Sequence, residues 1–243
     1  MFVPDNIRDP YFVFNGMDSR KMDIVSCSIK KRTRAKKRVK KIEVPGRDGA
    51  LYETDGSREN FEIEIECIVK NDSKKIDSLC SWLDGSGELI LSTDLEKRYK
   101  VRIDNKIDIE EIMHYFNKFI LIFDAYPYAY SVNEYDDLLE LEKPAAILNK
   151  GTAEAEPTIT IYGAGEVSLS INNIVYKLKS VSGYVTINSE IMEVYKGDDN
   201  ESEIYTIPEN TENIFPILKK GENNISWIGN VQKVVIEPNW RWL

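Results

Sequence analysis

The 243 residues suffice for one large domain or two ordinary domains with apolar cores. With 42% hydrophobic and 30% charged residues, the composition is that of a folded globular protein and excludes an intrinsically disordered chain. The start, Met1-Phe-Val-Pro-Asp, has no basic leader and no apolar segment, so we expect no secretory signal. Residues 119–123 form a long apolar run, but it is far too short to span a membrane.

The first half of the chain is predicted to be mainly β. The clearest strand is 61–69, FEIEIECIV, in which apolar residues alternate with glutamates, as is typical of a strand with one face toward solvent. An ambiguous segment, 107–116, is also interpreted as a strand. The other predicted strands are 12–14, 23–29, 88–92, 99–103 and 118–123.

One short helix is predicted between these strands, over residues 74–83, with Ser73 as its N-cap. Ile76, Leu79, Cys80 and Leu83 fall at helical spacing, so we expect this side of the helix to pack on a sheet.

The second half is predicted to be an antiparallel β-sandwich, because short strands follow one another without helices. Pro144 and Pro157 punctuate the connection that precedes it. We therefore divide the chain into domains 1–140 and 141–243. The strands expected in the second domain are 158–162, 167–171, 174–178, 184–187, 191–195, 225–228 and 231–236.

The charge is distributed unevenly along the chain. Nine of the twelve residues 30–41 are Lys or Arg; the chain has 32 such residues in all, which leaves 23 against 41 Asp and Glu elsewhere. Turn dipeptides Pro45-Gly46 and Asp48-Gly49 follow this basic run. The run is a solvated arm, a contact with acidic neighbours, or a channel or DNA contact. Its members are Lys30, Lys31, Arg32, Arg34, Lys36, Lys37, Arg38, Lys40 and Lys41.

The sequence offers no pattern for catalysis or for a cofactor. His114 is the only histidine, so a Ser-His-Asp triad with a spare base and a two-histidine zinc site cannot be built. The three cysteines, Cys27, Cys67 and Cys80, lack metal-ligand spacing and indicate free thiols in a reducing compartment. We predict no catalytic residues, no cofactor and no metal site.

Trp240 and Trp242 are the candidate contacts for a glycan, since they would share one face of an extended segment. Packing within the domain is the alternative interpretation of both rings.

The order of these motifs resembles the distal tail protein (Dit) family of long-tailed phages over nearly the whole chain. The matching segments are 45–49 (PGRDG), the strand from 61, 82–85 (WLDG), 88–91 (ELIL), 99–103 (YKVRI), 119–127 (FILIFDAYP), 151–157 (GTAEAEP), 162–165 (YGAG), 220–225 (KGENNI) and 238–242 (PNWRW).

The resemblance implies an N-terminal β-sandwich or barrel-like ring domain with one short helix, and a C-terminal galectin-like β-sandwich. It further implies a homo-hexameric ring that joins the tail tube protein to the tail-tip or baseplate and host-adsorption apparatus. DNA would pass through the lumen of this ring, and the protein would reside in the virion tail after assembly in the host cytoplasm.

We therefore expect a non-enzymatic structural hub. The alternatives are a carbohydrate-binding accessory module that contacts the host cell wall and, more remotely, a wall hydrolase, since carboxylates are abundant.

Overall fold

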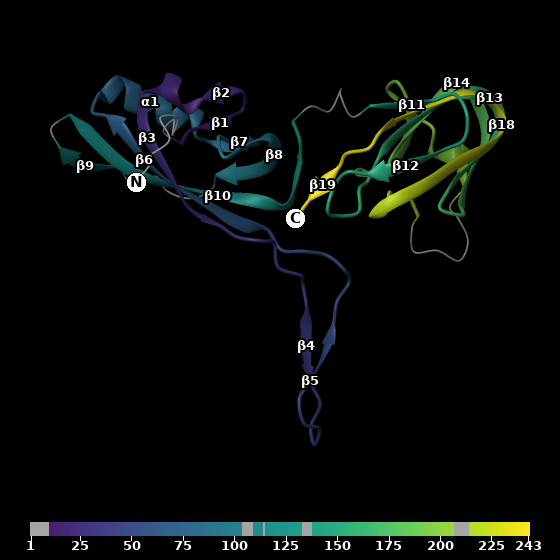
Figure 1. Cartoon of the computed structure of the whole chain (residues 1–243), viewed down its shortest axis with the longest axis horizontal. Helices are drawn as coiled ribbons and strands as arrows, with labels where there is room; N and C mark the ends of the chain where they lie inside the picture. The colour runs from purple at the N-terminus through teal and green to yellow at the C-terminus, as the bar shows by residue number, and fades with distance from the viewer. Residues whose placement is uncertain (1–9, 104–108, 114, 133–137, 207–213) are drawn as a thin grey trace, which may run out of the picture. The chain divides into compact units, whose positions relative to one another are not determined.

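The computed structural model describes residues 10–103, 109–113, 115–132, 138–206 and 214–243 (Figure 1). Of residues 26, 30–32, 73, 74 and 111–113 it describes the backbone alone. The predicted mainly β fold is confirmed. The chain forms two compact units, Met1–Ala129 together with Leu243, and Tyr130–Trp242. The domain boundary expected after residue 140 lies C-terminal to this division.

The first unit is built on one sheet with the strand order β2-β1-β7-β8-β10-β6-β3, and β9 pairs with β10 beside this path. The ambiguous segment 107–116 does contain a strand, β9. The strands are β1 (Phe12–Phe14), β2 (Met17–Asp18), β3 (Ile24–Arg32), β6 (Phe61–Lys70), β7 (Gly85–Leu91), β8 (Asp94–Ile103), β9 (Glu110–Met113) and β10 (Phe116–Ser131).

The core of the first unit follows the alternation seen in the sequence of β6. Ile63, Ile65, Cys67 and Val69 are completely buried, whereas the glutamates between them reach the outer face. β6 pairs antiparallel with β10 on one side and with β3 on the other. Period-two patterning therefore predicted both the strand and its buried face.

The helix α1 (Ser73–Trp82) packs on this core through its last turn. The indole of Trp82 stacks on Phe12, with ring centroids 5.7 Å apart, and its Nε1 donates to the Phe14 carbonyl at 3.1 Å. Leu79 is buried, but Cys80 is exposed, contrary to the expectation. Neighbouring helical positions point about 100° apart, so a stripe centred on Leu79 leaves Cys80 toward solvent.

The second unit contains one large antiparallel sheet with the order β11-β18-β13-β14-β15-β16, to which β12 adds beside β18 and β17 beside β14. The strands of this sheet are β11 (Leu139–Leu141), β12 (Ala145–Asn149), β13 (Thr158–Ile171), β14 (Ile174–Asn188), β15 (Glu193–Lys196), β16 (Asp199–Asn200), β17 (Tyr205–Thr206) and β18 (Gly221–Glu237). The last strand of the chain, β19 (Arg241–Trp242), lies outside this sheet and pairs with β10.

The sequence prediction divided three of these strands wrongly. Segments 158–162 and 167–171 are one strand, β13; segments 174–178 and 184–187 are β14; and segments 225–228 and 231–236 are β18. Gly163, Gly165 and Gly229 lie at irregularities of the register of β13 and β18 and do not form turns.

Two glycines allow β13 and β18 to cross closely at these irregularities. A Cβ atom at Gly163 would lie 2.4 Å from the Asn230 carbonyl oxygen, and one at Gly229 would lie 2.4 Å from that of Glu166. Gly229 also has φ +122°, which side chains rarely adopt. The long strands therefore bend and stay paired.

Candidate assembly surface

Lys30, Lys31 and Arg32 of the basic run end β3, and its other members belong to an arm that leaves the sheet of the first unit between β3 and β6. We call residues 33–60 the arm. Its two ends are adjacent because Arg32 and Ile63 are paired residues of β3 and β6. Figure 1 shows the arm extending away from the sheet of its own unit as a narrow hairpin with β4 (Lys40–Glu43) and β5 (Ala50–Glu53).

Backbone hydrogen bonds join the two legs of the arm over most of its length. Near the base, the Glu59 amide donates to the Lys36 carbonyl at 2.8 Å, and the Arg38 amide donates to the Ser57 carbonyl at 3.0 Å. Further out, β4 pairs with β5 from Lys40 opposite Glu53 onward. The arm is therefore an ordered two-stranded ribbon.

The tip of the arm closes with the predicted Pro-Gly turn. The Arg47 amide donates to the Val44 carbonyl at 3.1 Å, which places Pro45 and Gly46 at the two central positions. Gly46 has φ +79°, as the third residue of a type II turn requires. The dipeptide therefore sets the reversal of the chain.

The outgoing leg presents cations to solvent. One of these cations is paired within the arm: Lys41 Nζ lies 2.5 Å from Glu43 Oε1. The structure describes only the backbone of residues 30–32, so the contribution of their side chains to the predicted surface stays a prediction. The exposed cations are Arg34, Lys36, Lys37, Arg38, Lys40 and Lys41.

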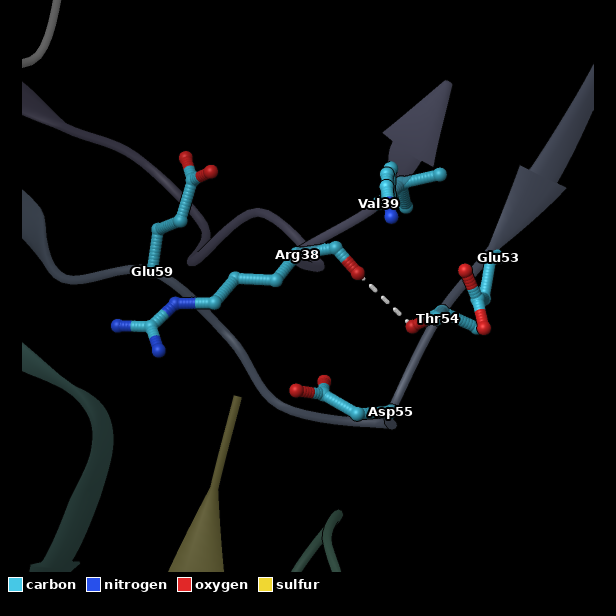
Figure 2. Close-up of a pocket in the computed structure, with 7 residues that line it drawn as sticks. Arg38, Val39, Glu53, Thr54, Asp55 and Glu59 are labelled. Atoms are coloured by element: carbon cyan, nitrogen blue, oxygen red, sulfur yellow. Dashed lines mark hydrogen bonds between the residues drawn. The ribbon is translucent and has the colours of Figure 1, made fainter. Parts of the chain in front are cut away.

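The returning leg places acids beside these cations. Figure 2 shows the Arg38 side chain extending past Asp55 toward Glu59, along an open depression on the arm. The Thr54 hydroxyl donates to the Arg38 carbonyl at 2.8 Å. Hydrogen bonds from Ser57, together with the positive charge of Arg38, lower the pKa of Asp55. Each leg thus carries a different sign of charge, with an excess of cations.

Apolar side chains on the arm are also open to solvent. Tyr52 is 69% exposed, and Val39, Val44 and Leu51 are each at least 40% exposed. A lone two-stranded ribbon is marginally stable in water and buries little apolar surface. This exposure fits a surface that a partner covers. The sequence analysis missed these residues, although the pattern of a short hairpin without a third strand could have indicated them.

The predicted glycan contacts lie in different surroundings. Trp240 is 2% exposed and belongs to the core of the second unit, so its ring faces cannot stack on a sugar. Trp242 is half-buried and packs against the same core. His114 lies outside the described residues. Glycan binding at Trp242 stays a prediction.

Among the described residues, no group of three His, Cys, Asp or Glu side chains is arranged to hold a metal ion. Within the same part of the chain, no helix has the length and apolar character needed to cross a bilayer.

Comparison with known proteins identifies the class to which this fold and arm belong. Residues 7–125, just under half of the chain, match the family described as phage tail protein RIFT-related domain. No curated protein matches the sequence.

The fold of both units is similar to the crystal structure of the phage SPP1 Dit protein, described as a paradigm of the hub adsorption apparatus in phages that infect Gram-positive bacteria. The TM-score is 0.71 at 14% identity, over 94% of this chain and 98% of that chain. The expected resemblance to the distal tail protein family is thus confirmed: residues 7–125 match a phage tail family, and nearly the whole chain has the fold of a Dit protein.

Proposed function

We propose that copies of this chain form a hexameric ring that serves as the hub of a phage tail. One face of the ring would bind the tail tube protein, and the other would bind the tail-tip or baseplate proteins. Its lumen would let DNA pass, and its work would be geometric and without catalysis. Assembly would take place in the host cytoplasm, and the finished ring would reside in the virion tail.

The observation that carries this proposal is the likeness of nearly the whole chain to a protein described as a hub of an adsorption apparatus. A likeness confined to one unit would leave the other free for an unrelated role. Here 94% of the chain is covered, so both units enter the comparison. Closed rings of identical subunits are the economical way to repeat one interface.

The arm supports a specific way of making that interface. Its exposed cations and apolar side chains would dock on an acidic surface of a neighbouring subunit or tail protein. The rest of the chain is acidic, so another copy offers such a surface. Of the three interpretations of the basic run, we therefore favour the contact with acidic neighbours.

Native mass spectrometry of the purified full chain tests the proposal. We expect a species of six times the 28.0 kDa subunit mass, in equilibrium with monomer at low concentration. A ring-shaped particle in negative-stain images would accompany it. A monomer that stays monomeric with the tail tube and tail-tip proteins present would overturn the proposal.

A further inference from the structure

Two buried thiols face each other on the strands that hold the arm. Cys27 on β3 and Cys67 on β6 are directly paired across the sheet, and their sulfur atoms are 3.7 Å apart. Both are free and almost fully buried. Directly opposed residues of antiparallel strands have Cα atoms about 4.5–5.5 Å apart, and this separation lies within the range that a disulfide bond spans.

We propose that Cys27 and Cys67 form a reversible cross-strand disulfide that staples the two strands carrying the arm once the protein meets a small-molecule disulfide. The sulfur atoms would have to approach from 3.7 Å to about 2.05 Å, which side-chain rotation and a small shift of β3 can supply. No change of strand register is needed, because the two residues are already partners.

The structure assigns the two thiols different parts in the exchange. A hydrogen bond joins the two sulfur atoms, and Cys27 lies on the outermost strand of the sheet. This bond lowers the pKa of Cys27, and the same bond together with burial raises the pKa of Cys67. The Cys27 thiolate attacks one sulfur of the oxidant and bonds to it, so that a mixed disulfide forms and the other sulfur of the oxidant leaves as a thiolate. Cys67 then loses its proton and attacks the Cys27 sulfur, so that a second small thiol leaves. Two protein thiols are oxidised, and one small disulfide is reduced.

Access for the oxidant requires β3 to open locally, and its place in the sheet favours this. β3 is the last strand in the sheet order, so it has β6 as its partner on one side. Its register shifts between Ile24 and Ser26 and again between Ile29 and Lys31, on both sides of Cys27. These interruptions confine the opening to a short segment.

The staple would have a direct effect on the arm. Cys27 and Cys67 lie on the two strands that the arm connects, about five residues inside the sheet from the Arg32–Ile63 pair at which the arm begins, so their bond would hold these two strands together behind the arm. The cytosol keeps thiols reduced, whereas surroundings outside the cell are oxidising. The bond would thus form after a particle leaves its host and would fix an arm already in its final place.

The test uses the full chain carrying Cys80→Ser, because the exposed Cys80 could otherwise react with the oxidant. The protein is incubated with oxidised glutathione, quenched in acid, unfolded and treated with iodoacetamide. We expect an intact mass lower by two hydrogen atoms, no alkyl group added, and a proteolytic fragment that links Cys27 to Cys67. The unfolding temperature should rise by about 5 °C or more, and dithiothreitol should reverse it.

Two further variants in the same background determine the order of steps. Cys67→Ser should accumulate a glutathione adduct on Cys27, whereas Cys27→Ser should show neither an adduct nor a shift in unfolding temperature. Alkylation of both thiols after oxidation, or a lasting glutathione adduct without the link, would overturn the proposal. An adduct on Cys67 in the Cys27→Ser variant would overturn the assignment of Cys27 as the attacking thiol.

Discussion

Gly229 shows how one residue determines the path of a long strand. At this position β18 passes the backbone of β13 so closely that a Cβ atom would lie 2.4 Å from the Glu166 carbonyl oxygen. The sequence pattern suggested a turn, because glycine between apolar runs usually marks one. Only the paired strand reveals that the residue provides space, and that information is absent from the local sequence.

Replacing Gly229 with alanine should destabilise the second unit. The side chain would meet the Glu166 carbonyl and would also occupy a strained φ, so we expect a loss of about 2–4 kcal/mol in the free energy of unfolding. Gly221→Ala is the matched control on the same strand, since its φ is +83° but its Cβ would meet nothing within 4 Å. Its cost should be about 1 kcal/mol. Equal losses in urea unfolding would refute the close-approach argument.

Tyr176 gives the second unit a dependence on alkaline pH. Its hydroxyl bonds to the Phe215 carbonyl at 3.3 Å, and burial raises the pKa of Tyr176 to about 12. The unfolded value is about 10, so the stability that this hydroxyl contributes is present below pH 10 and is lost as the pH rises through about 12.

We expect Tyr176→Phe to flatten the loss of stability between those two pH values, although the variant is less stable at neutral pH because the hydrogen bond is gone. Thermal unfolding across the alkaline range measures this slope. The same replacement at the exposed Tyr52 serves as the control. A slope identical in Tyr176→Phe and the parent would contradict the assignment.

Among the structural elements, the arm is the one whose conformation depends most on which strands it pairs with. Its turn and its basic composition were predictable, because Pro45-Gly46 and the run of cations are local features. Its independence from the sheet was not predictable. A segment of alternating residues can continue a sheet or leave it, and hydrogen-bond partners decide between the two.

Reversing arm charges should weaken assembly while the subunit stays folded. Arg34, Lys36 and Lys37 are exposed, and among described residues they have no ion-pair partner, so changing all three to glutamate should leave the fold intact. We expect each subunit contact to weaken by about tenfold to a hundredfold, as charge complementarity is lost. Native mass spectrometry measures the shift toward monomer.

The matched control reverses three exposed lysines of the second unit, Lys177, Lys179 and Lys219. If the arm acts by charge, this control should assemble like the parent protein. High salt should weaken assembly of the parent more than that of the arm variant. Unchanged assembly of the arm variant would eliminate the arm as a charged contact.

At the scale of the whole molecule, the sequence predicted those features that depend on the periodicity of apolar residues and on the order of motifs along the chain. Strand alternation indicated the mainly β fold, and the order of short motifs indicated the family. The interior of the second unit was harder to read. Trp240 was a candidate glycan contact, with packing as the alternative interpretation, and it packs in the core because the chain after β18 folds back on its own unit. Burial of an aromatic ring depends on residues that are distant in sequence and pack around it. The spacing of neighbouring residues along the chain does not reveal which residues these are.

The pairing of Arg32 with Ile63 means that the arm enters and leaves the sheet at a single rung. A hairpin inserted at such a point can be exchanged independently of the sheet: a two-residue turn could replace it without altering the pairing register of β3 and β6. Lengthening it would cost little chain entropy, since closure of a loop depends only logarithmically on its size. Evolution could thus retune the reach of the arm for a new tail architecture while the rest of the unit stayed as it is.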